Sequence, residues 1–156
     1  MNIDDLEFSR YDGEQALQIR DTIEDIYTRS YVDAIASGDP FDAPEAFMTR
    51  FDSYAKRPDF DMVVGRRRGI AVAQTWGWPL NESARVGWWA GLLAEPEPGF
   101  TDEDGKRTFA LSEIMVDQGH TGQGVAHAIH DQLLSARHEQ RATLLVEPDN
   151  SRAYRA

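Results

Sequence analysis

Three glycines lie close together where an apolar segment gives way to an amphipathic one. Gly119, Gly122 and Gly124 follow the apolar residues 114–116 and precede apolar side chains at helical spacing. The first N–H groups of a helix have no partner within it, and the helix dipole makes that end positive. Glycines allow the backbone to come close to a phosphate, because no Cβ intervenes. The spacing therefore predicts an anion-binding loop; a tight turn that needs positive φ is the structural alternative.

Two common phosphate-binding motifs fit this loop poorly. A P-loop needs Lys and then Ser or Thr after its last glycine, where this chain has Val125 and Ala126. The dinucleotide-binding motif matches at two of its three glycines, with Glu147 placed as a ribose-binding acid, but His127 replaces the third glycine. Further βαβ units would also have to follow. An NAD(P)-dependent oxidoreductase is therefore disfavoured.

The segment 121–126, TGQGVA, resembles the cofactor-binding motif of the GNAT-type N-acetyltransferase superfamily. That motif has Gln or Arg, two further residues, Gly, one residue, and then Gly or Ala; Thr121 departs from it at the first position. The apolar end of the preceding strand, 114–116, and the segment 144–153, LLVEPDNSRA, are also similar to the family's pattern. The resemblance is close over 107–156 and looser before it.

The resemblance implies acetyl-CoA as co-substrate and no metal. Backbone N–H groups from about Gly122 to Ala126 would hold the diphosphate, and the strand edge 114–116 would bind the pantetheine arm. In this family two parallel strands, here 107–116 and 142–147, splay apart around the cofactor. Asn150 would lie near the arm or its thiol end. The cofactor-binding residues expected in this way are Ile114, Met115, Val116, Thr121, Gly122, Gln123, Gly124, Val125, Ala126 and Asn150.

Acetyl transfer to an amine needs a base, a polarised thioester carbonyl and a proton for the leaving thiolate. Glu113 is the candidate base, because the family often has a glutamate on this strand and burial in an apolar strand would raise its pKa toward neutrality. A carboxylate satisfied by an arginine or by backbone donors is the equal alternative. The N–H of Val116 would polarise the carbonyl. Tyr154 is the candidate proton donor, one helical turn before the position that the family uses.

Periodicity predicts the elements that position these residues. A strictly alternating strand over 107–116 would place Phe109, Leu111, Glu113 and Met115 on one face. The fold class is α/β, with a mixed, mostly antiparallel central sheet and helices on both faces, similar to the acyl-CoA N-acyltransferases and forming one domain over 1–156. Helices are expected over 14–34, 44–54 and 122–138, and strands over 6–11, 61–66, 70–78, 86–93, 107–116 and 142–147. The short turn 67–69 would join the strands 61–66 and 70–78 as a hairpin.

The composition of the chain disfavours several classes of binding partner. A formal net charge of -11 disfavours nucleic acid, and the absence of cysteine excludes thiolate chemistry. No apolar run approaches membrane-spanning length, so a cytoplasmic enzyme without a membrane partner is expected. The expected reaction is direct acetyl transfer to a small-molecule or peptide amine in a ternary complex. The two last strands of the family would lie past residue 156. A non-catalytic CoA-binding or assembly module, or a homodimer that completes the sheet edge, therefore stays open.

Overall fold

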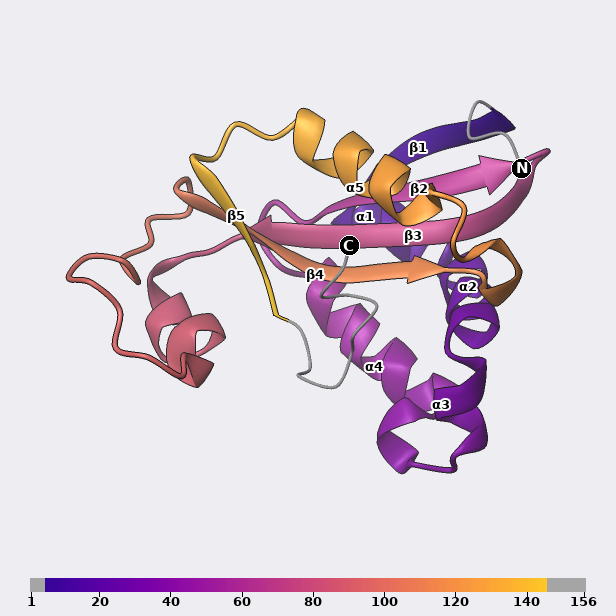
Figure 1. Cartoon of the computed structure of the whole chain (residues 1–156), viewed down its shortest axis with the longest axis horizontal. Coiled ribbons are helices and arrows are strands. Elements are labelled where there is room, and N and C mark those ends of the chain that lie inside the picture. The colour runs from indigo at the N-terminus through magenta and orange to yellow at the C-terminus, as the bar shows by residue number, and fades with distance from the viewer. Residues whose placement is uncertain (1–4, 146–156) are drawn as a thin grey trace.

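Within residues 5–145, five strands form one sheet in the order β1-β2-β3-β4-β5, which is also their order along the chain. The structure is a computed structural model that describes residues 5–145, and in it β1 to β4 pair antiparallel, whereas β4 and β5 pair parallel (Figure 1). The mixed, mostly antiparallel sheet predicted from the sequence is confirmed. The strands are β1 (Leu6–Asp12), β2 (Asp61–Arg67), β3 (Ile70–Pro79), β4 (Thr108–Val116) and β5 (Arg141–Leu144).

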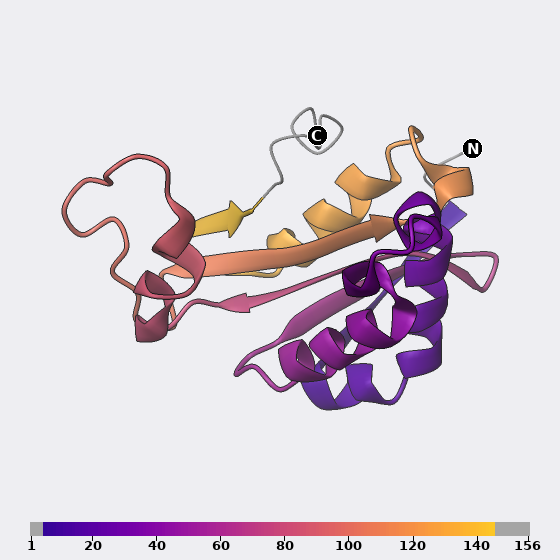
Figure 2. The same ribbon diagram turned by 90° about the horizontal axis from the view of Figure 1, so that it is seen from below.

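Helices cover both faces of the sheet, as Figure 2 shows and as the sequence predicts. The helices before β2 pack on one face, and α5 packs on the other. Within residues 5–145, no helix has the length and apolarity that crossing a membrane requires. The helices are α1 (Gly13–Leu17), α2 (Arg20–Ser30), α3 (Val32–Ala36), α4 (Pro44–Ala55) and α5 (Val125–Ser135), with 3₁₀ turns η2 (Pro40–Asp42), η3 (Glu82–Arg85), η4 (Trp88–Gly91) and η5 (Gln118–His120).

Each face of the sheet buries its own apolar core. Aromatic side chains dominate the core under α2 and α4, where Tyr27 stacks on Phe47 with 3.9 Å between ring centroids and Trp76 is fully buried. Branched aliphatic side chains dominate the core under α5, where Ile129 and Leu133 are fully buried. The face under α2 and α4 therefore carries most of the large polar-edged rings, Tyr and Trp, that can also contact a ligand.

A β-bulge in β4 reverses the side-chain alternation in the middle of that strand. Trp76 on β3 lies opposite Glu113, and the next residue of β3, Gly77, lies opposite Leu111, so Ser112 is the extra residue. Leu111 consequently packs in the core under α5, whereas Met115 packs in the core under α2 and α4. The prediction that Phe109, Leu111, Glu113 and Met115 share one face is wrong, because one inserted residue shifts a period of two.

The β2–β3 connection is the tight hairpin that the sequence predicts. Its two turn residues, Arg68 and Gly69, have φ of 52° and 80°. Left-handed conformations at both positions give the turn the twist that the flanking strands require. This turn lies at the same end of the sheet as the end of β4, since Ala73 pairs with Val116.

The predicted helix over 14–34 is divided into α1, α2 and α3. Asp12 caps α1: its carboxylate accepts a hydrogen bond from the N–H of Gln15 at 2.8 Å, and the side-chain oxygen of Gln15 accepts one from the N–H of Asp12 at 2.9 Å. α1 lies against α4 so closely that a Cβ on Gly13 would be 2.0 Å from the carbonyl oxygen of Ala55. α2 instead packs on β3 and β4. One straight helix could not make both contacts.

Two other predicted elements differ from the structure. The strand expected over 86–93 is wrong: this segment belongs to the loop between β3 and β4 and includes η4, with Val86 82% and Leu93 101% exposed. The last helix begins at Val125 rather than at 122, because Gly122 and Gly124 have positive φ. β5 begins at Arg141 and ends at Leu144, and 146–147 of the predicted strand lie outside the described residues.

The bulge depends on the absence of a side chain at Gly77. A Cβ there would lie 2.2 Å from the carbonyl oxygen of Ala110 and 2.8 Å from the ring of Phe109. We expect Gly77→Ala to lower the free energy of unfolding in urea by at least about 2 kcal/mol, because rigid backbone must move. Gly65→Ala is the matched control, since its Cβ would meet only ordinary contacts at 3.7 Å or more. Equal stability of the two variants would contradict this account of the bulge.

Candidate active site

The loop after β4 begins with a short 3₁₀ turn that has a side-chain cap. The carboxylate of Asp117 accepts a hydrogen bond from the N–H of Gly119 at 2.7 Å and so begins η5. Gly122 and Gly124 then adopt φ of 75° and 82°, a conformation that glycine favours, and Gly124 is the N-cap of α5. Both explanations of the glycines thus apply in part: two of them satisfy a left-handed turn, whereas Gly119 does not need one.

A series of backbone N–H groups in this loop is unpaired. Among the described residues, none accepts a hydrogen bond from the N–H groups of 121–127, and the first amide of α5 that is paired belongs to Ala128, which donates to the carbonyl of Gly124 at 3.1 Å. No side chain of residues 5–145 caps the helix. A Cβ on Gly122 would meet nothing within 4 Å. The loop therefore presents consecutive donors at a positive helix end, which suits an anion such as a diphosphate.

An ion pair joins this loop to the opposite face of the sheet. The guanidinium of Arg29 on α2 pairs with Asp117, and it also donates to the carbonyl of Ala71 at 2.5 Å and to Asp25 at 2.9 Å. Burial acts to raise the pKa of Asp117, but the Gly119 N–H and the Arg29 charge outweigh it and lower that pKa. Arg29 thus neutralises a carboxylate that would otherwise repel an anion in the loop.

The edge of β4 that faces away from β3 is open over its second half. β5 pairs with β4 only from Thr108 to Leu111, and in Figure 1 it runs at a steep angle across β4. The N–H of Asp117 donates to Val72 on β3 at 2.7 Å, so alternation directs the backbone groups of Ile114 and Val116 away from β3. Within residues 5–145, nothing pairs with that edge beyond Leu111.

Glu113 lies on the face covered by α2 and α4, where the bulge places it. Its side chain is half-buried, and its carboxylate has no hydrogen bond or ion pair with any residue of 5–145. Desolvation raises its pKa to about 7, and the charge of Arg50 on α4 opposes that shift. The Glu113 charge in turn helps to raise the pKa of Tyr31 and Tyr54, after burial, which is the larger cause. A half-buried carboxyl with a pKa near neutrality suits a general base.

The structure brings part of the predicted site together and extends it. The residues predicted from the sequence that lie in or beside the loop and open edge are Glu113, Ile114, Met115, Val116, Thr121, Gly122, Gln123, Gly124, Val125 and Ala126. Met115 differs from its neighbours, because its side chain is buried in the core under α2 and α4. Asn150 and Tyr154 lie outside the described residues. Sequence reasoning missed Arg50 and Tyr54, although their spacing of four residues on one helix could have shown a shared face.

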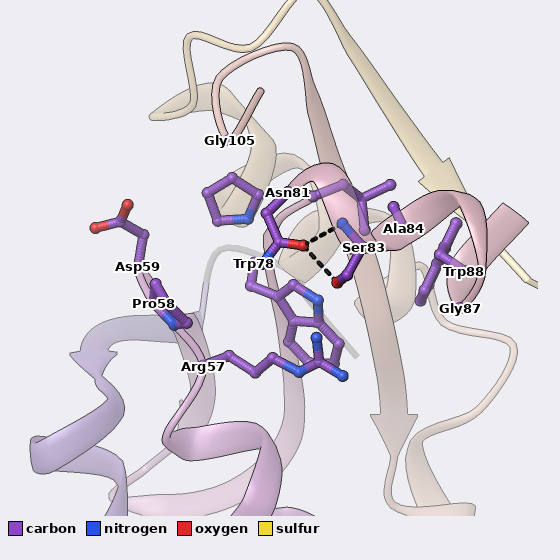
Figure 3. Close-up of a pocket in the computed structure, with 12 residues that line it drawn as sticks. Arg57, Pro58, Asp59, Trp78, Asn81, Ser83, Ala84, Gly87, Trp88 and Gly105 are labelled. Carbon is purple, nitrogen blue, oxygen red and sulfur yellow. Dashed lines mark hydrogen bonds between the residues drawn. The ribbon is translucent and has the colours of Figure 1, made fainter. Parts of the chain in front are cut away.

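A pocket of about 190 Å³ lies at the end of β3, and Glu113 is not part of its lining (Figure 3). The loop between β3 and β4 forms one of its walls. Glu103 anchors this loop: its buried Oε2 accepts hydrogen bonds from Trp89 at 3.1 Å, Thr108 at 2.9 Å and Arg141 at 2.8 Å. The residues that line the pocket are Arg57, Pro58, Asp59, Trp78, Pro79, Leu80, Asn81, Ser83, Ala84, Gly87, Trp88 and Gly105.

Several solved structures share this arrangement of elements. Aminoglycoside N-acetyltransferase AAC(6')-Iy in complex with CoA superposes with a TM-score of 0.59 at 10% identity, covering 96% of this chain and 82% of that chain. A ribosomal-protein-alanine N-acetyltransferase from Brucella melitensis biovar Abortus 2308 gives 0.53 at 14% identity, covering 96% and 86%. An aminoglycoside acetyltransferase from an uncultured soil metagenomic sample, in complex with trehalose, gives 0.59 at 12% identity, covering 98% and 85%.

The similarity to these proteins lies in three-dimensional structure. No protein-family model and no curated protein sequence matches this chain. Identities of 10% to 14% carry the fold and nothing finer. The implied fold is confirmed: this chain has the fold of the GNAT-type N-acetyltransferases.

Proposed function

We propose that this protein is an acetyl-CoA-dependent N-acetyltransferase that transfers the acetyl group directly to a primary amine in a ternary complex. One observation carries the proposal. The unpaired amides of 121–127, the open edge of β4 and the unpartnered carboxylate of Glu113 adjoin one another along β4 and the loop that follows it. The anion site suits the diphosphate of acetyl-CoA, the open strand edge suits its pantetheine arm, and the base suits the transfer of its acetyl group.

The residues of the loop and strand edge fit this co-substrate. The N–H groups from Gly122 to Ala126 would bind its diphosphate, and Thr121 and Gln123 would flank that group. The backbone of Ile114 and Val116 would hydrogen-bond the amide groups of the pantetheine arm, as an added strand does. The buried Met115 would support this edge from the core rather than contact the arm. We propose Asn150, outside the described residues, as a further contact near the thiol end.

Glu113 would accept the proton that the amine nitrogen loses as it attacks the acetyl carbonyl carbon. The N–H of Val116 would donate to the carbonyl oxygen, where negative charge develops. The carbon–sulfur bond then breaks, and we propose Tyr154 as the proton donor to the departing sulfur. No cysteine is available in this chain to carry an acetyl group, which favours direct transfer.

Two measurements test the function itself. Calorimetric titration with acetyl-CoA, CoA and NADH separates a CoA-binding protein from a nicotinamide enzyme. Release of free CoA across a panel of amines then separates an enzyme from a non-catalytic binding module. Binding of CoA without amine-dependent release would support the module and contradict the enzyme.

The first prediction concerns Glu113 in catalysis. Because only the ionised carboxylate accepts a proton, kcat/KM should rise with pH up to about 7 and then level off from this group. Glu113→Gln should lower kcat/KM by roughly 100-fold or more and remove the inflection near pH 7, while the inflection from the acceptor amine remains. Glu7→Gln, an exposed carboxylate on β1, is the control. An unchanged profile in Glu113→Gln would show that another group is the base.

The second prediction concerns Glu113 in stability. Its pKa is raised in the folded state, so the folded protein holds this proton more tightly than the unfolded chain does. Ionisation of Glu113 therefore destabilises the fold as pH rises from about 4.5 to 7, and that loss is fully present above pH 7. We expect Glu113→Gln to be more stable than the wild type by roughly 1–3 kcal/mol at pH 8 and equal to it at pH 4. Urea denaturation at both pH values measures this difference, and a less stable variant at pH 8 would contradict the desolvated carboxylate.

The third prediction concerns the loop. Gly122→Asp places a negative charge beside the unpaired amides, and repulsion of a diphosphate about 5 Å away should weaken CoA binding roughly tenfold. Gly122→Asn has nearly the same shape without the charge and should bind CoA more tightly than Gly122→Asp. Gly38→Asp is the positional control, because Gly38 also has positive φ and open space around a Cβ. Equal CoA affinity of all three variants by calorimetry would place the diphosphate elsewhere.

A further inference from the structure

Two arginines on the Glu113 face have no carboxylate partner among residues 5–145. The chain has 27 acidic residues for 16 basic ones, and most arginines of 5–145 form an ion pair. Arg50 instead stacks on Phe41, with 3.9 Å from its guanidinium carbon to the ring centroid, and donates to the Phe41 carbonyl. The guanidinium of Arg57 stacks on Trp78 at 4.8 Å, and no residue of 5–145 accepts a hydrogen bond from that guanidinium. The charge of Arg50 acts on Glu113, and the charges of Arg50 and Arg57 both act on the neighbouring Tyr54, so this region has two guanidinium groups available to bind the negative charge of a ligand.

Arg57 lies in the wall of the 190 Å³ pocket. Figure 3 shows its side chain extended along the indole of Trp78, with Trp88 at the far side of the same pocket. Asn81 uses its Oδ1 to accept hydrogen bonds from Ser83, at 2.9 Å from the N–H and 2.6 Å from Oγ, which directs its amide N–H₂ elsewhere. The acidic residue of the lining, Asp59, carries its carboxylate away from Trp78 in Figure 3. The pocket therefore offers a guanidinium beside flat apolar rings.

Aromatic side chains connect the wall of this pocket to the surroundings of Glu113. Trp76 lies opposite Glu113 on the neighbouring strand, and Trp78 follows two residues later on the same face, about 7 Å along β3. Tyr54 stacks on Trp78 with 5.3 Å between centroids. Burial and the charge of Glu113 raise the pKa of Tyr54, while the charges of Arg50 and Arg57 oppose that rise. Tyr54 thus adjoins the carboxylate on one side and the Arg57 pocket on the other.

We infer that the amine acceptor carries an anionic group, a carboxylate or a phosphate, which Arg57 binds in this pocket while the amine lies at Glu113. A guanidinium binds either group through two parallel hydrogen bonds, and the Trp78 ring holds it in position. The inference rests on the proposed function for the amine end only, because binding of the anion needs no acetyl transfer. The overall charge of -11 alone would have favoured a cationic acceptor, but in this pocket the guanidinium of Arg57 lies along Trp78, whereas the carboxylate of Asp59 points away from that ring.

The test compares amines that differ only in the anionic group. The probes are phenylalanine against phenylalaninamide, phosphoethanolamine against ethanolamine, and putrescine as the cationic amine. Quenching of tryptophan fluorescence and calorimetry report binding without acetyl transfer, and CoA release reports turnover separately. We expect one anionic probe to bind at least tenfold more tightly than its neutral partner; the phenylalanine pair tests carboxylate and the phosphoethanolamine pair tests phosphate.

Arg57→Gln should remove that preference, and Arg57→Lys should retain part of it because the charge stays while the paired donors are lost. Arg68→Gln at the β2–β3 turn is the control, since it removes the same charge at the other end of β3. Neutral or cationic probes that bind as well as anionic ones, an Arg57→Gln variant with unchanged preference, or no binding by any probe would each overturn the inference. Anion binding without CoA release would retain the pocket and contradict the proposed enzyme instead.

Discussion

The candidate site depends on the unequal pairing of the two edges of β4. One edge pairs with β3 over nearly the whole strand, whereas the other pairs with β5 only from Thr108 to Leu111. Ser112 is inserted at the point where this pairing stops, so the bulge and the open edge coincide. A bulge increases local twist, which separates neighbouring strands. The same inserted residue turns Glu113 onto the face covered by α2 and α4, away from Leu111. One local irregularity therefore opens an edge for a ligand and places a carboxylate beside it.

The charges in this region are arranged differently from what the negative net charge of the whole chain would suggest. The loop after β4 has unpaired N–H groups, and its nearest carboxylate, Asp117, is neutralised by Arg29. Glu113 differs from Asp117, since it is half-buried and its carboxylate has no partner within the part of the chain that the structure describes. A protein selected for stability alone would pair or remove such a carboxylate, because desolvation of an unpaired charge is unfavourable. The arrangement is therefore better explained by chemistry at this position than by folding.

Sequence patterns predicted the parts of this site that depend on local conformation. The glycine loop, the β2–β3 hairpin and the strand that carries Glu113 follow from backbone preferences within a few residues. The bulge did not, because a single inserted residue leaves the apolar composition of 107–116 unchanged and only shifts its period. The segment 86–93 was mistaken for a strand for a related reason. It is apolar, yet it buries Trp89, which donates a hydrogen bond to Glu103 14 residues away in the same loop, and it leaves Leu93 exposed. Tertiary contacts, rather than periodicity, determine that segment.

The buried Glu103 connects the β3–β4 loop to the first residues of β4 and β5. Its Oε2 joins Trp89 of the β3–β4 loop to Thr108, which begins β4, and to Arg141, which begins β5. Arg141 also donates to Thr108 at 2.6 Å, so β4 and β5 are tied together at the end where they pair. Because these strands are fixed at that end, their separation further along is defined by the bulge rather than by slippage of β5. The same anchored loop forms a wall of the Arg57 pocket. The buried carboxylate of Glu103 thus stabilises both the strands that define the open edge and the loop that forms a wall of the pocket.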